Sequence, residues 1–100
     1  MSLTYIDHIA IESENIDKAV SWYTKEFDCK IKYQDSTWAL LTFDNISLAL
    51  VTPGEHPPHF AVVDKNVFTD KKSKLHRDGI HYIYKTDPDS NVIEKIDRKT

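Results

Sequence analysis

His8 is a candidate for chemistry because it interrupts a stretch that otherwise alternates like a buried strand. In the run TYIDHIAIES, successive side chains would point to opposite faces, so His8 shares its face with Ile6 and Ala10. An imidazole among apolar neighbours is either a hydrogen-bonded structural group or part of a functional site. The residue type alone leaves both interpretations open.

Two other polar residues have similar surroundings in the second half of the chain. His59 begins the strand-like run HFAVVD and shares a face with Ala61, and Glu94 lies in VIEKID on the same face as Ile96. Glu94 taken alone would be interpreted as a surface glutamate. Imidazole nitrogens and carboxylate oxygens are nevertheless groups that bind transition metals.

Other kinds of catalytic site find no support in the sequence. There is no Ser-His-Asp order, phosphate-binding glycine loop or paired-cysteine metal site, and the chain has only 2 glycines. The single Cys29 cannot form an internal disulfide, which fits a reducing compartment. No basic residue apart from Lys30 visibly pairs with Cys29, so a catalytic cysteine is the weaker interpretation.

The pattern of apolar residues predicts the same succession of elements in both halves. Residues 13–28 have helical spacing, with Ser13 or Asn15 as the cap of the first turn and Asp28 where a left-handed residue commonly ends a helix. A Pro-rich connector separates the halves. Strands are predicted at 30–35, 37–43, 46–52, 59–64, 80–86 and 92–97, and a second, short helix at 65–79 ending at Gly79.

This half-repeat resembles the vicinal oxygen chelate superfamily, which includes glyoxalase I, bleomycin-resistance proteins, fosfomycin-resistance enzymes and extradiol dioxygenases. The resemblance rests on IDHIAIES followed by IDKAVSWYTKEFDCKIKY, on HFAVV, and on YIYKTDPDSNVIEKID, and it spans nearly the whole chain. DPDSNVIE is its most specific part, although Ser90 stands where the family usually has Gly. Asp28, at the end of the predicted first helix, likewise stands where the family usually has Gly.

The resemblance implies an α+β fold in one glyoxalase-like domain, residues 1–100. Two βαβββ modules, at about 1–53 and 57–100, would form a cup-shaped mixed sheet, with the second module shortened because only three of its strands are convincing. It also implies that His8, His59 and Glu94 are metal ligands. His56 is a possible substitute for His59, but it lies in the Pro-rich connector, and His76 and His81 are better explained as surface and sheet residues.

Two imidazoles and one carboxylate make a facial triad that suits Fe, Mn, Ni or Zn and leaves coordination positions for substrate. The expected function is therefore a metal-dependent lyase, isomerase, transferase or dioxygenase acting on a small vicinal-oxygen substrate. The alternative is a non-catalytic protein of the bleomycin-resistance kind that binds a small molecule without metal. Glyoxalase I-type sites use a fourth ligand on the last strand of the first module, where this chain offers only Ser47 and Thr52 as polar side chains.

The composition of the chain indicates which kinds of partner to expect. The net charge of -3, with basic residues scattered except in DKKSKLHR, argues against nucleic-acid binding. No segment approaches the roughly 18 apolar residues of a membrane span, and the first residues lack a signal-peptide pattern. We therefore expect a cytoplasmic protein with a small-molecule substrate. Exposed sheet edges and apolar cup surface in so short a chain predict a homodimer.

Overall fold

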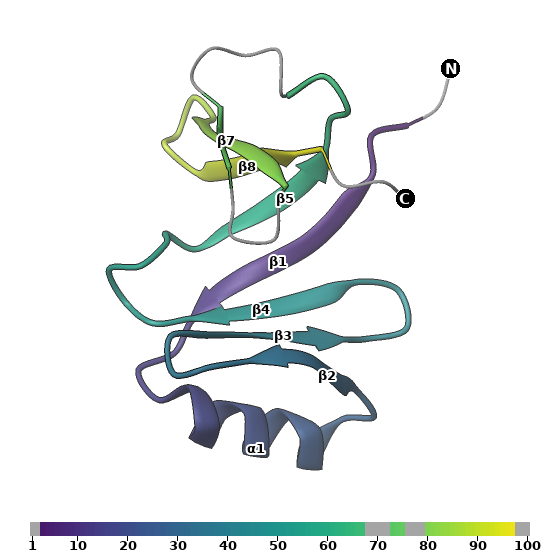
Figure 1. Ribbon diagram of the computed structural model, residues 1–100, viewed down its shortest axis with the longest axis vertical. Helices are drawn as coiled ribbons and strands as arrows, with labels where there is room; N and C mark the ends of the chain where they lie inside the picture. The colour runs from purple at the N-terminus through teal and green to yellow at the C-terminus, as the bar shows by residue number, and fades with distance from the viewer. Residues whose placement is uncertain (1–2, 68–72, 76–79, 98–100) are drawn as a thin grey trace. The chain divides into compact units, whose positions relative to one another are not determined.

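The computed structural model describes residues 3–67, 73–75 and 80–97. The chain divides into two compact units, residues 8–58 and residues 1–7 together with 59–100. The elements of both units are labelled in Figure 1. Among the described residues, no helix combines the length and the apolar character needed to cross a membrane.

The unit formed by residues 8–58 contains one helix and a sheet of mixed direction. Its sheet has the strand order β2-β3-β4-β1, in which β1 is parallel to β4 and the other neighbours are antiparallel. In Figure 1 the helix α1 lies along the strands β2–β4. The elements are β1 (Ile6–Glu12, whose first two residues belong to the other unit), α1 (Ile16–Glu26), β2 (Lys30–Gln34), β3 (Trp38–Thr42) and β4 (Ser47–Val51).

The helix begins after Asn15, one of the two predicted caps, but it ends differently from the prediction. Asn15 is the N-cap, and its Oδ1 accepts a hydrogen bond from the Lys18 amide at 3.1 Å. The prediction of a left-handed Asp28 is wrong, because among the described non-glycine residues only Ser90 has a positive φ. The chain leaves the helix through Phe27, which is extended at φ -132° and packs its ring 6.0 Å from Phe43.

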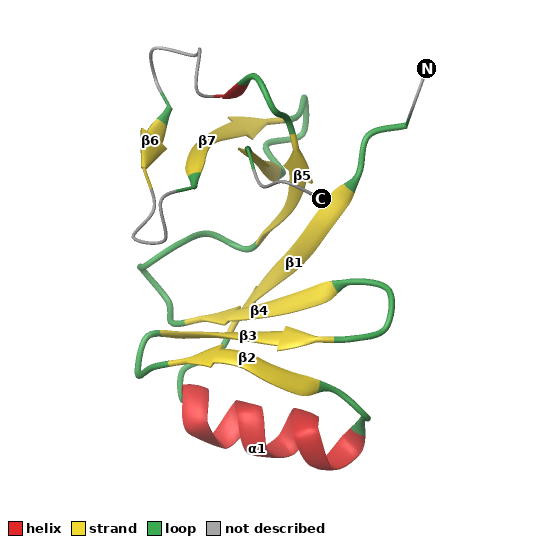
Figure 2. Ribbon diagram, turned by 45° about the vertical axis from the view of Figure 1, so that its right-hand side comes forward, coloured by secondary structure: helices red, strands yellow, loops and turns green. Residues whose placement is uncertain are grey.

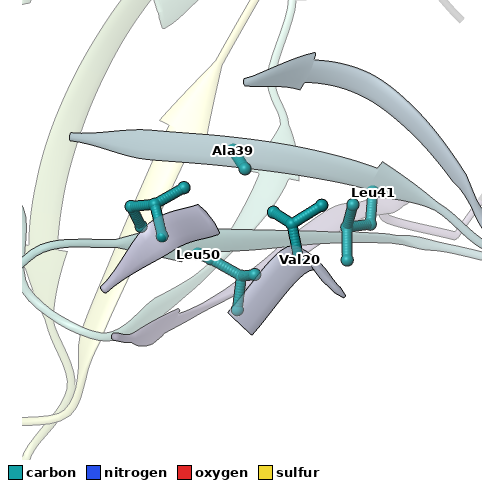
Figure 3. Packing of buried hydrophobic residues seen from close by; sticks show 5 residues of the cluster. Val20, Ala39, Leu41 and Leu50 are labelled. Atoms are coloured by element: carbon teal, nitrogen blue, oxygen red, sulfur yellow. The ribbon is translucent and has the colours of Figure 1, made fainter. Parts of the chain in front are cut away.

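Both faces of this sheet bury apolar side chains. The helix-facing cluster joins Ile16 and Val20 of α1 to Ala39, Leu41 and Leu50 of the strands, and Figure 3 shows this packing. Because strand residues alternate, the opposite face carries a second cluster of Ala10, Leu40 and Ala49, against which Trp38 packs. His8 lies two residues before Ala10 and therefore shares this helix-free face.

The other unit repeats the strand connections. Its sheet has the order β5-β8-β7-β6, in which β5 is parallel to β8 and the other neighbours are antiparallel. The Val63 amide also donates to the Tyr5 carbonyl at 3.0 Å, so the N-terminal residues join this unit. The strands, seen from a second direction in Figure 2, are β5 (His59–Val63), β6 (Lys74–Leu75), β7 (His81–Thr86) and β8 (Val92–Ile96).

The second unit also corrects one part of the sequence prediction. Most of the helix predicted at 65–79 lies outside the described residues, but Lys74–Leu75 form a strand that pairs with β7. The fourth strand of the module is therefore present and only two residues long. Two exposed residues give no recognisable alternation, so the pairing with β7 was not visible in the sequence.

Candidate metal centre

An imidazole and a carboxylate meet inside the unit that contains residues 59–100. His59 Nε2 lies 3.3 Å from Glu94 Oε1, and the two side chains are only 4% and 3% exposed. Parallel pairing of β5 with β8 places Ala61 opposite Glu94, so His59, two residues before Ala61, belongs to the same face of the sheet. The structure therefore brings together two of the three predicted ligands.

The turn before β8 fixes where Glu94 enters the sheet. Asp87 Oδ1 accepts hydrogen bonds from the Asp89 and Asn91 amides, both at 2.8 Å, and the Asp87 amide donates to the Asn91 carbonyl at 2.9 Å. Ser90 adopts φ 69°, the left-handed conformation that glycine adopts most easily. The Gly-to-Ser departure from the family pattern thus falls on a residue where the backbone requires this conformation.

Tyr84 borders the pair from the neighbouring strand. It is the register partner of Glu94 in the antiparallel β7–β8 ladder, and its ring centroid lies 5.2 Å from that of His59 in an edge-on arrangement. Burial and the charge of Glu94 raise the pKa of Tyr84 well above its usual value, so the phenol stays protonated at neutral pH.

The other histidines lie on other elements of the chain. His8 belongs to the unit formed by residues 8–58, on the helix-free face of its sheet and in register with Ser47. His56 lies in the loop between β4 and β5 rather than in a strand. His81 contacts Asp97 through Nδ1 at 3.0 Å, as expected for a residue that serves the sheet, and His76 lies outside the described residues.

The chemistry of the His59–Glu94 pair fits a divalent metal ion. Two ligands about 2.1 Å from an ion and at right angles to each other are about 3.0 Å apart, close to the observed 3.3 Å. Among the described residues, Glu94 is the one charged residue that is buried. A carboxylate at such a depth needs a charged or hydrogen-bonding partner, and a metal ion is the strongest partner of this kind.

Comparison with known proteins gives a result for structure but not for sequence. No protein-family model matches the sequence, and a search of curated proteins finds no match. The structure, in contrast, is similar to many solved structures. A hypothetical protein from Bacillus halodurans superposes with a TM-score of 0.75 at 15% identity, covering 99% of this chain and 97% of that one.

Two further solved structures carry functional descriptions. A glyoxalase/bleomycin resistance protein/dioxygenase superfamily member from Vibrio splendidus gives a TM-score of 0.69 at 12% identity, covering 94% of this chain and 98% of that one. Methylmalonyl-CoA epimerase from Streptomyces coelicolor, solved with 2-nitronate-propionyl-CoA, gives 0.71 at 18% identity over 95% and 97% of the two chains. At these identities the likeness is one of fold. The protein therefore has the glyoxalase-like α+β fold of the vicinal oxygen chelate superfamily.

Proposed function

We propose that the protein is a metal-dependent enzyme that binds a small substrate through two neighbouring oxygen atoms, with His8, His59 and Glu94 as metal ligands. The observation that carries the proposal is the buried His59–Glu94 pair, with its donor atoms 3.3 Å apart. Each of the three residues offers one ligand atom, an imidazole nitrogen or a carboxylate oxygen. His8 joins the set on the strength of the family resemblance and its place on a helix-free sheet face.

Two imidazoles and one carboxylate favour Fe, Mn, Ni or Zn and leave about three positions of an octahedral ion open. When bound, such an ion would supply Lewis-acid stabilisation of negative charge on the substrate oxygens. Glu94 contributes charge and geometry, and the edge-on ring of Tyr84 restricts the orientation of His59. The burial of both ligands limits access of bulk water to the pair.

The paired-oxygen substrate has support from one structural relative. The Streptomyces coelicolor epimerase was solved with a nitronate derivative of propionyl-CoA, and a nitronate carries two oxygens on one atom. A ligand of this kind can occupy two open positions of one ion. The alternative, a metal-free sequestering protein of the bleomycin-resistance kind, has no need of a buried carboxylate beside an imidazole.

The test is metal binding by purified protein and four single variants. We expect about one divalent ion per chain in the wild type, and loss of most of it in His8→Ala, His59→Ala and Glu94→Ala. His56→Ala is the matched control, because His56 lies three residues from His59 but in the connecting loop. Equal occupancy in wild type and all variants, by elemental analysis and titration, would refute the site.

The same ligand set argues against one reaction of the superfamily. Isomerising a hemithioacetal requires a base that moves a proton between adjacent carbons, and the strand β4 carries no carboxylate. Glu94 is committed as a ligand. We therefore expect negligible turnover of the methylglyoxal-glutathione hemithioacetal with Ni, Zn or Mn, and robust turnover that disappears in Glu94→Ala would contradict this assignment.

We further propose a cytoplasmic homodimer. Three large apolar side chains of the unit formed by residues 8–58 are about half exposed: Trp22 at 54%, Phe27 at 46% and Ile31 at 50%. Exposed apolar surface of this kind is commonly covered in an oligomer. The free, half-buried Cys29 is compatible with a reducing compartment. Sedimentation at micromolar concentration tests the dimer, and a monomer there would exclude it.

A further inference from the structure

The strand β2 is an exposed edge of the sheet in the unit formed by residues 8–58. It stands at the end of the strand order, with β3 as its one neighbour among the described strands, and Figure 2 shows it as the last strand of that sheet. All five of its residues are exposed. The main-chain N–H and C=O groups on the outer side of an edge strand can pair with a further extended segment.

Two lysines give this edge a local positive charge. Lys30 and Lys32 are two residues apart, at most about 7 Å along an extended strand. Lys30 pairs with Thr42 on the face opposite α1, because its neighbour Ile31 pairs with Leu41 of the helix-facing cluster. The register passes from Ile31 directly to the next residue but one, so Lys32 is the extra residue of an irregularity in β2. Lys32 is therefore not committed to the ladder with β3.

The lysines disfavour pairing of β2 with a second copy of itself. In an antiparallel pair of two copies centred on Ile31, Lys30 of each copy would lie opposite Lys32 of the other. In a pair centred on Lys32, the two copies of that lysine would meet. Like charges directly opposite each other destabilise a strand pair. The charge of this edge therefore favours a strand of opposite charge over a second copy.

The end of β2 has a fixed geometry. The ring of Tyr33 stacks on that of Trp38, with the ring centroids 4.5 Å apart. The Asp35 carboxylate accepts hydrogen bonds from the Tyr33 hydroxyl and from the Thr37 and Trp38 amides. An edge that is ordered before binding loses little conformational freedom when another segment pairs with it.

Acidic residues at both ends of β2 limit which segment fits. Asp28 lies two residues before Lys30, and Asp35 directly follows the strand. The hydrogen bonds to Asp35 hold its pKa well below the usual range, so this carboxylate is charged at neutral pH. An acidic residue opposite either aspartate would be repelled. A matching segment therefore carries its acidic residues in the middle, opposite the two lysines.

We propose that β2 is a docking edge for an extended acidic segment of a partner protein. The segment would add a strand beside β2 through main-chain hydrogen bonds, with two carboxylates near Lys30 and Lys32. Acidic residues two apart in an extended segment point to the same side and have the spacing of the two lysines. This surface involves neither the metal ligands nor the substrate, so it goes beyond the proposed function.

The experiment titrates isotope-labelled protein with three blocked seven-residue peptides. The first alternates valine and glutamate, and the second alternates valine and lysine. The third is the glutamate peptide with methylated amide nitrogens, which keeps the charge but cannot donate main-chain hydrogen bonds. Calorimetry and ¹H–¹⁵N spectra measure binding. The glutamate peptide should bind about tenfold more tightly than either of the others, with the largest shifts in residues 30–34.

Charge reversal on β2 should reverse the preference. Lys30→Glu and Lys32→Glu should each weaken binding of the glutamate peptide about threefold, and the double variant should bind the lysine peptide more tightly than the glutamate peptide. Lys25→Glu is the matched control, because Lys25 is an exposed lysine of α1, and it should leave the preference unchanged. Thermal unfolding of each variant establishes that it is folded.

Several outcomes would refute the docking edge. These are equal affinity for the glutamate and lysine peptides, unchanged binding of the methylated peptide, and a glutamate preference that persists in the double variant. Sedimentation adds another, because a dimer that dissociates when the glutamate peptide is added would make β2 a contact between copies. Metal occupancy should be the same in the double variant and the wild type, so the docking edge and the metal site stand or fail separately.

Discussion

The two units share one strand order but differ in what they bury. The unit formed by residues 8–58 buries apolar side chains on both sheet faces, with the helix α1 covering one of them. The other unit buries Glu94 beside His59 on the face that also carries Ala61 and Ile96. The same topology can thus hold a hydrophobic core in one copy and a polar pair in the other.

This difference separates stability from function. Burial of apolar surface stabilises a fold at about 25 cal/mol per Å². A buried ion pair can contribute little or nothing to stability, because the desolvation of both groups offsets their attraction. The unit formed by residues 8–58 should therefore dominate resistance to unfolding, and the His59–Glu94 pair should dominate ligand chemistry. Four predictions test this contrast.

The largest effect is expected at Glu94. Glu94→Gln keeps the shape of the side chain but removes its charge, so metal affinity should fall by more than about a hundredfold. The free energy of unfolding of the metal-free protein should change much less, by about 1–2 kcal/mol. Metal titration and urea unfolding measure the two quantities. A large loss of stability with unchanged metal affinity would make the pair structural.

Leu50→Ala should give the reverse result. Leu50 is fully buried between the helix and the sheet, and truncation should lower the free energy of unfolding by about 2–4 kcal/mol. Because Leu50 faces the helix and His8 faces the opposite side, metal affinity should change little. Leu48→Ala, at a partly buried position of the same face, is the matched control and should cost less.

Acid should lower the stability of the folded state through one aspartate in a turn of each unit. Hydrogen bonds from the side chain and the backbone amide of Asn91 lower the pKa of Asp87 below its ordinary value of 3.8. Hydrogen bonds from the Tyr33 hydroxyl and the Thr37 amide likewise lower the pKa of Asp35. A carboxyl whose pKa is depressed on folding stabilises the folded state above its unfolded pKa. This stabilisation is lost as the pH falls through the folded pKa.

Asp87→Asn and Asp35→Asn should each reduce the loss of stability between about pH 4 and pH 2, as measured by urea unfolding at a series of pH values. Asp44→Asn is the comparison, since Asp44 also lies in a turn but accepts none of the hydrogen bonds described for the other two. An acid profile that is the same in all three variants and the wild type would show that the turns do not respond to acid.

The smallest effect is expected at Ser90. Its φ of 69° is unfavourable for a residue with a Cβ atom, so Ser90→Gly should raise the free energy of unfolding by about 0.5–1 kcal/mol. Thermal unfolding of the variant measures this gain, and metal affinity should stay the same. Ser36→Gly, in another turn without a positive φ, should be neutral or destabilising.

Local patterns in the sequence determined most of the elements. Alternation and helical spacing depend on neighbouring residues, so the strands β2 to β5, β7 and β8 were predictable within one residue at each end, and α1 within three residues, with Asn15 one of its two predicted caps. The strand β6 was not, because its two exposed residues take their conformation from pairing with β7. The end of α1 also depended on a distant contact, that of Phe27 with Phe43.

For the candidate site, the sequence supplied the residue types and their faces, while only the tertiary structure decided which atoms meet. Taken alone, Glu94 would be interpreted as a surface glutamate, and only the family resemblance singled it out as a ligand. The pairing of β8 with β5 places it beside His59. The stack of Tyr33 on Trp38 and the edge-on contact of Tyr84 with His59 likewise require pairing across strands. The physical reason is that side-chain alternation is local, whereas strand register and burial depend on residues far apart in the chain.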